Sequence, residues 1–290
     1  NTVAPVVGAV IQNRDTSVKV NTIQMTVNGS VVPATVAANA DGASLNWAML
    51  PLPASGAVNT AKVTFKDNLN VDVSTEWTFV INYVSLDPAN RQAGTGKTRG
   101  FKVRMVQSPE GTELANDLQR AEDQLALSPS LPTPLVDTNT VLQLVNMAQD
   151  DRSSGYFTGP DYPEDLVPGL DQNPGLTDGF TVEINAYLDL TAGAHRFGVV
   201  TDDGYKISAG ASLSDKNPVL GAKSGGTANE SFDFVVPVAG LYPFRMIWYE
   251  QGGNAYAEWF SVDLATGVRT LINDAKTATA VKAYLDLSAP

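Results

Sequence analysis

The chain has 290 residues, of which 43% are hydrophobic and 17% charged, a balance typical of globular proteins rather than disordered ones. Its net charge of −12 argues against binding to nucleic acid, and no stretch approaches the ~20 apolar residues needed for membrane insertion. The absence of cysteine excludes disulfides, thiolate metal sites and cysteine nucleophiles.

Residues 1–84 predict a β-sandwich of about seven short strands. Apolar side chains alternate with polar ones, and the dipeptide Asn28-Gly29 is typical of a two-residue hairpin turn. The order of these signals resembles the bacterial immunoglobulin-like (Ig-like) repeats of cell-surface proteins. The alternating apolar residues are Ile23, Met25 and Val27, then Leu45, Trp47 and Met49, then Val63 and Phe65, and finally Trp77, Phe79 and Ile81.

Residues 85–98 predict a polar, glycine-rich linker. Within it, the run from Gly94 to Thr98 looks like part of a phosphate-binding loop. Arg91 stands where that motif requires its first glycine, and no buried strand leads into the run. We therefore expect a flexible linker and no nucleotide site.

One amphipathic helix is predicted over residues 109–127. Ser108 can cap its start, and Pro109 suits the first turn. We expect the helix to pack on the second domain, residues 99–287. Its apolar face would consist of Leu114, Leu118, Ala121 and Leu125.

Residues 128–179 are rich in Pro, Gly, Asp and Ser, so they predict long loops with little regular structure. Alternation typical of β-strands returns at Phe180 and continues to Val268.

Two strands expected in this region share a pattern, because Ala192-Gly193-x-x-x-Phe197 matches Ala239-Gly240-x-x-x-Phe244. Each strand leads into a polar loop, the first containing Asp202-Asp203-Gly204 and the second Glu250-Gln251-Gly252-Gly253-Asn254. If both strands run in the same direction, both loops lie at the same end of the sandwich.

Asp202 and Asp203 are the clearest candidates for a functional site. Two adjacent carboxylates at the end of a strand cannot both face an apolar core, because burying an unpaired charge is very costly. They either point into water or share a cation, and Ca²⁺ is the ion that best suits such oxygen ligands. The residues alone leave both alternatives open.

The runs from Leu190 to Tyr205 and from Val238 to Glu250 resemble the PA14 family of β-sandwich domains. In lectin members of that family, two consecutive aspartates joined by a cis peptide hold a Ca²⁺ that binds sugar hydroxyls. A later loop adds an Asn side chain and backbone carbonyls. The resemblance implies Ca²⁺ ligands at Asp202, Asp203 and Asn254, and ligand contacts from Gly204, Tyr205, Gln251, Gly253, Asn254 and Tyr256.

The expected fold class is therefore all-β, with an Ig-like sandwich over 1–84, a linker over 85–98 and a PA14-like sandwich over 99–287. The expected function is an extracellular, calcium-dependent carbohydrate-binding or adhesion module of a bacterial surface or secreted protein. Its partners would be glycans or cell-surface polysaccharide. The start at Asn1, without an initiator Met or signal peptide, is interpreted as a processed product or a piece of a larger protein.

Asp202 or Asp203 with Glu250 could be drawn as the carboxylate pair of a glycosidase. Small sandwich modules of this kind usually bind and leave chemistry to a neighbouring domain, so we expect no catalysis. The alternative function is a structural subunit of an extracellular assembly or filament, in which Ca²⁺ provides rigidity only.

Overall fold

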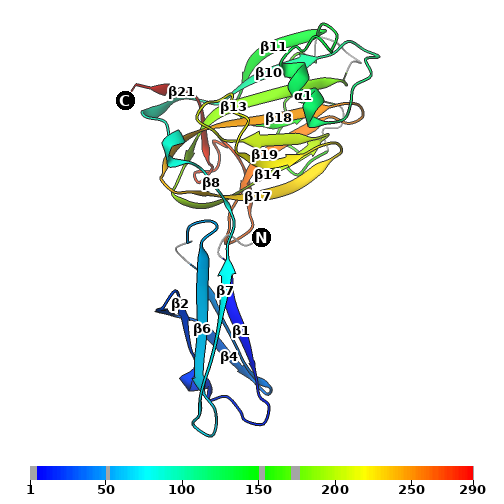
Figure 1. Ribbon diagram of the computed structural model, residues 1–290. Helices are drawn as coiled ribbons and strands as arrows, with labels where there is room; N and C mark the ends of the chain where they lie inside the picture. Colours follow the sequence, from blue (N-terminus) through cyan, green and yellow to red (C-terminus); the bar gives the residue numbers. More distant parts are fainter. Residues whose placement is uncertain (1–4, 50–52, 150–153, 171–176, 290) are drawn as a thin grey trace. The chain divides into compact units, whose positions relative to one another are not determined.

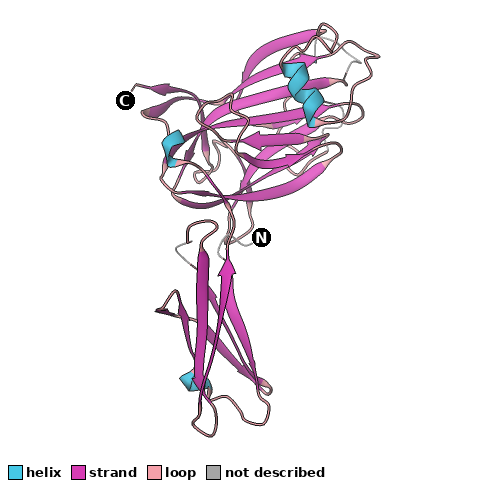
Figure 2. Cartoon of the chain, viewed as in Figure 1, coloured by secondary structure: helices cyan, strands magenta, loops and turns pink. Residues whose placement is uncertain are grey.

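Strands make up most of the chain in the computed structural model, which describes residues 5–49, 53–149, 154–170 and 177–289 (Figure 2). The fold is all-β, as predicted, and α1 (Leu118–Leu125) is the single α-helix of the described residues. The chain divides into two units, 1–83 and 84–290. No helix in the described part of the chain is long and apolar enough to span a membrane.

The first unit contains two antiparallel sheets (Figure 1). One has the order β1-β5-β4 and the other the order β3-β2-β6-β7. A short 3-10 helix, η1 (Val20–Thr22), precedes β2. The strands are β1 (Val6–Gln12), β2 (Gln24–Val27), β3 (Ser30–Val32), β4 (Thr35–Asn39), β5 (Gly42–Ala48), β6 (Val58–Lys66) and β7 (Asp72–Val80).

The alternation read from the sequence forms the core of this unit. Met25, Val27, Leu45 and Val63 are buried in one cluster, against which the predicted aromatic residues pack. The turn between β2 and β3 is the predicted one, with Asn28 at φ 51° and Gly29 at φ 79°. These left-handed angles suit Asn and Gly, which explains why this dipeptide marks the hairpin.

The second unit is a sandwich of an eight-stranded and a six-stranded sheet that share one hydrophobic core. The larger sheet has the order β11-β10-β13-β18-β15-β16, with β21 on β13 and β9 on β21. The smaller has the order β12-β19-β14-β17-β8, with β20 on β19. The strands of the larger sheet are β9 (Thr95–Arg99), β10 (Phe101–Gln107), β11 (Val136–Leu142), β13 (Phe180–Leu190), β15 (Tyr205–Ser208), β16 (Val219–Lys223), β18 (Gly240–Glu250) and β21 (Lys282–Ser288). Those of the smaller sheet are β8 (Val84–Ser85), β12 (Asn146–Ala148), β14 (Gly193–Asp202), β17 (Ala228–Val236), β19 (Tyr256–Val262) and β20 (Arg269–Leu271).

Residues 85–98, predicted as a linker, are instead bonded into the second unit. β8 pairs in parallel with β17, Leu86 is buried in the shared core, and β9 pairs with β21. The short 3-10 helix η2 (Pro88–Asn90) lies between these strands. Backbone hydrogen bonds hold this segment, so its polar composition gave no sign of it.

The glycines of the run that looks like a phosphate-binding loop serve packing in this arrangement. A side chain at Gly96 would clash with the ring of Tyr284, and one at Gly94 would clash with the carbonyl of Ser288. Both partners belong to β21, so the two glycines allow β9 to approach that strand closely.

The predicted helix start was wrong. α1 begins at Leu118, and the Asp117 side chain caps it by accepting a 2.8 Å hydrogen bond from the Arg120 N–H. Ser108 instead directly follows β10, and its N–H donates to the carbonyl of Gly179. The apolar face is as predicted from Leu118 onward. Ala121 and Leu125 of the helix form one buried cluster with Val106, Ile247 and Tyr249 on the outer side of the large sheet.

Residues 128–179 contain β11 and β12, where mainly loops were predicted. β11 is an edge strand with mostly exposed residues, so its sequence lacks a buried alternating face. β12 is only three residues long. Neither strand carries a periodic signal that a sequence reading can detect.

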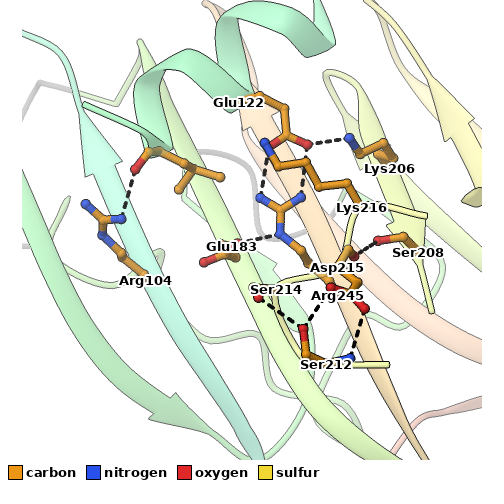
Figure 3. A network of polar contacts seen from close by, with 11 residues as sticks. Arg104, Glu122, Glu183, Lys206, Ser208, Ser212, Ser214, Asp215, Lys216 and Arg245 are labelled. Atoms are coloured by element: carbon orange, nitrogen blue, oxygen red, sulfur yellow. Dashed lines mark hydrogen bonds and ion pairs between the residues drawn. The ribbon is translucent and has the colours of Figure 1, made fainter. Parts of the chain in front are cut away.

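A charged network fastens α1 to the outer face of the large sheet (Figure 3). The carboxylate of Glu122 accepts hydrogen bonds of 2.9 and 3.0 Å from Arg245 of β18, and it also pairs with Lys206 and Lys216. Arg245 in turn bonds Glu183 of β13. Burial by itself would raise the pKa of Glu122, but these cationic hydrogen bonds outweigh burial and lower that pKa to about 2.

Glu122→Gln is expected to destabilise the second unit by about 3 kcal/mol, because it leaves Arg245 buried with half of its charge partners. Urea unfolding measures this change. The control is Glu76→Gln, at an exposed position of the first unit. In the wild type the contribution of Glu122 is complete above pH 4.5 and is lost as the pH falls towards 2. Equal unfolding midpoints for the two variants would contradict this role for Glu122.

Candidate functional site

The ends of β14 and β18 meet at one end of the second sandwich, as their shared sequence pattern predicts. The indole N–H of Trp248 donates to the carbonyl of Asp202 at 2.8 Å. The N–H of Asp203 donates to the carbonyl of Tyr249, and the N–H of Tyr249 donates to the carbonyl of Gly204, both at 3.2 Å. These bonds place the two polar loops side by side although their strands belong to different sheets.

The two aspartates differ in their exposure to solvent. The peptide bond between them is cis. Asp203 is 6% exposed, and its Oδ2 accepts a 3.0 Å hydrogen bond from the N–H of Gln251. Asp202 is half-buried. Burial, and after it the negative charge of Asp203, raises the pKa of Asp202. Asp203 therefore forms the floor of the candidate site, and Asp202 lies closer to water.

Glu250, the last residue of β18, adds a third carboxylate and is 0% exposed. Its Oε1 accepts a 2.7 Å hydrogen bond from the N–H of Gly252, whereas its Oε2 is buried with no hydrogen-bond partner among the described residues. Burial, then the charges of Asp203 and Asp202, raises the pKa of Glu250 to about 9. This environment therefore favours the neutral, protonated form of Glu250 near pH 7.

The loop after β18 supplies exposed amide groups next to the aspartates. Gln251, Gly253 and Asn254 are exposed, and the N–H of Gly253 donates to Asp178 at 3.3 Å. Tyr256, at the start of β19, is half-buried and lies opposite Asp202 in the strand register. The structure thus brings Gln251 against Asp203 and Tyr256 against Asp202, and it places Asn254 in the same exposed loop.

Tyr205, predicted as a ligand contact, is instead 1% exposed and packs in the core. Its hydroxyl donates to Glu230 at 3.3 Å, and burial raises its pKa. Two further aromatic residues near these loops, Trp248 and Tyr249, are also buried, whereas Tyr256 is half-buried and can present part of its ring to a ligand. Gly204 is likewise buried, and its lack of a side chain allows the Tyr249 hydroxyl to approach.

Arg120 is a residue of this region that sequence reasoning missed. It lies on α1, is buried, and places its guanidinium 4.8 Å from the ring centroid of Tyr249. One of its N–H groups donates to the carbonyl of Glu250 at 3.4 Å. Burial lowers the pKa of Arg120, although the charges of Asp203 and Glu250 act against that shift. Its position on the helix gives no sequence signal, because charged helix residues usually face solvent.

The possible metal ligands at this end are oxygen atoms, which suit a hard cation such as Ca²⁺ better than a softer metal ion. No group of three or more His, Cys, Asp or Glu side chains in the described ranges is arranged to hold a metal ion. A cation at this end would therefore combine the aspartates with amide and carbonyl oxygens, a donor set that Ca²⁺ accepts.

Comparisons with known proteins give distant structural similarities only. No family model and no curated protein matches the chain. A PA14 sugar-binding domain from an RTX adhesin is 13% identical with a TM-score of 0.39, covering 61% of this chain and 96% of that one. The Epithelial Adhesin 9 A domain from Candida glabrata, in complex with Galb1-4GlcNAc, is 13% identical with a TM-score of 0.44, covering 68% and 97%. The PA14 domain of the MpAFP antifreeze protein is 14% identical with a TM-score of 0.39, covering 67% and 96%. At these identities and TM-scores, the similarity assigns neither a family nor a ligand to this chain.

Gly204→Ala is expected to destabilise the second unit by about 1–3 kcal/mol through overpacking. The added Cβ would lie 2.5 Å from the Tyr249 hydroxyl and 2.6 Å from the carbonyl of Lys223. The matched control is Gly252→Ala, whose Cβ meets Asp178 only at 3.9 Å and should change stability by less than about 0.5 kcal/mol. Thermal unfolding of both variants tests this, and equal midpoints would show that Gly204 has no packing role.

Proposed function

We propose that the second unit is a calcium-dependent carbohydrate-binding module that acts in adhesion and has no catalytic activity of its own. The observation that carries the proposal is the pair Asp202 and Asp203, held at one end of a sandwich beside an exposed loop of amides. Its desolvated negative charge favours a bound cation, and the exposed side leaves room for a ligand.

Asp202, Asp203 and Asn254 would hold the ion, with Ca²⁺ supplying coordination positions that two neighbouring sugar hydroxyls can fill. Gln251 and Asn254 present exposed amides that can donate to and accept from further hydroxyls. Tyr256 offers an aromatic face beside Asp202. Such an open site buries little area, so we expect weak binding to single glycans and stronger binding by multivalent forms.

We also propose that the first unit is an Ig-like domain that carries the binding module on a bacterial surface or secreted protein. Its strand order supports this. β3-β2-β6-β7 corresponds to strands C′-C-F-G of an immunoglobulin sandwich, and β1-β5-β4 corresponds to B-E-D. In this proposal the partners are extracellular glycans or cell-surface polysaccharide.

A second candidate function is a structural subunit of an extracellular assembly, in which Ca²⁺ serves rigidity. The burial of Asp203 and Glu250 favours it, because a shell closed by protein oxygens leaves no position for a sugar. The two functions share the ion and differ in whether the ion remains accessible.

Calcium is expected to raise the melting temperature of the wild type, because a ligand that binds only the folded state stabilises it. Asp203→Ala and Asp202→Asn should both reduce this shift, and the milder Asp202→Asn should keep the calcium-free melting temperature. The control is Asp189→Asn. Asp189 is exposed and lies near the end of β13 that is remote from Glu250, so this variant should respond to calcium as the wild type does. An unchanged calcium response in both site variants would remove Asp202 and Asp203 from consideration as ligands.

Sugar binding is expected to require calcium. A multivalent form of the protein on a glycan array should bind neutral glycans with neighbouring hydroxyls, lose them in EDTA and recover them with added Ca²⁺. Asn254→Ala should alter the glycans bound and leave the melting temperature within about 2 °C of the wild type. Calcium binding without any glycan signal would favour the structural subunit.

A further inference from the structure

A second concentration of polar groups lies on the outer side of the small sheet, beneath residues 154–165. Asn146 of β12 and Glu258 of β19 are directly opposite each other in the strand register. Each is only 1% exposed. Phe157, whose ring packs 5.7 Å from that of Phe260, helps to cover this part of the sheet. Two polar side chains are therefore buried side by side in otherwise apolar surroundings.

Each of the two side chains has one polar atom that forms hydrogen bonds and one that forms none with the described residues. Oε1 of Glu258 accepts hydrogen bonds from the N–H groups of Tyr156 and Phe157, at 2.8 and 2.7 Å. The amide nitrogen of Asn146 donates to the carbonyl of Tyr162 at 3.3 Å. The remaining oxygens, Oε2 of Glu258 and Oδ1 of Asn146, are buried and have no hydrogen-bond partner among the described residues. Both are acceptors, so neither can satisfy the other while Glu258 is ionised.

Glu258 is buried among charges of both signs. Burial, together with the charge of Glu164 and opposed by the two backbone hydrogen bonds, raises the pKa of Glu258 to about 7. Arg269 acts in the opposite direction. Its guanidinium lies 4.6 and 4.8 Å from the ring centroids of Tyr156 and Phe260.

We propose that Glu258 Oε2 and Asn146 Oδ1 contribute to a second Ca²⁺ site, which holds residues 154–165 on the small sheet. The buried oxygens supply the hard ligands that Ca²⁺ prefers. This site does not depend on the proposed function, since its ligands are distinct from Asp202, Asp203 and Asn254.

Calcium titration by isothermal calorimetry separates the two sites. In Asp202→Asn/Asp203→Asn, which removes the first site, one Ca²⁺ per chain should still bind. Adding Glu258→Gln should abolish that binding, while its amide oxygen can still accept the two backbone hydrogen bonds. Asn146→Asp in the same double variant should tighten binding by about tenfold, because an added ligand charge increases calcium affinity.

Glu76→Gln in the double variant is the control and should leave the remaining binding unchanged. The proposal is overturned if the double variant binds no calcium and Asn146→Asp restores none. In that case a water molecule or a shared proton bridges the two oxygens. If Glu258→Gln fails to fold, the calcium affinity of the Asn146→Asp variant still tests the second site. The assignment of Asp202 and Asp203 as the first site is contradicted separately if the double mutation leaves the number of bound ions unchanged.

Discussion

The pairing of the ends of β14 and β18 is the constraint on which the candidate site depends. Backbone hydrogen bonds join Asp203 and Gly204 to Tyr249, so the carboxylates of Asp203 and Glu250 are held at the end of a packed core. Because two neighbouring carboxylates in a desolvated environment do not readily both ionise, the pKa of Glu250 rises to about 9. The guanidinium of Arg120 lies on one side of these groups, and the opposite side opens towards exposed amides, where a cation can approach.

This constraint gives the helix α1 a role beyond covering the large sheet. Arg120 lies two residues before Glu122, so the network that binds Glu122 to Arg245 also fixes the position of the guanidinium behind Tyr249. Two charged side chains of the helix thus serve anchoring and electrostatic balance respectively. A buried ion pair adds little to stability by itself, but it specifies one position of the helix on the sheet.

Periodicity in the sequence was enough to locate most strands, the hairpin at Asn28-Gly29 and the meeting of the two polar loops. It failed where structure depends on backbone pairing alone, as in residues 85–98 and the exposed strand β11. It also failed where a local cap overrides a plausible one, since Asp117 begins the helix in place of Ser108. The burial of Tyr205 and the burial of Arg120 near the site result from tertiary packing, which no local pattern in this sequence encodes.

The asymmetry between the two aspartates bears on whether the site serves binding or rigidity. A purely structural ion would favour burial of both carboxylates and enclosure by protein oxygens. Here Asp203 is buried with Glu250, whereas Asp202 is only half-buried and the loop from Gln251 to Asn254 is exposed. An ion bound here would be held from one side and would keep coordination positions on the other, towards the exposed amides and Tyr256. The geometry therefore favours an accessible ion, which is the physical requirement for a calcium-mediated contact with sugar hydroxyls.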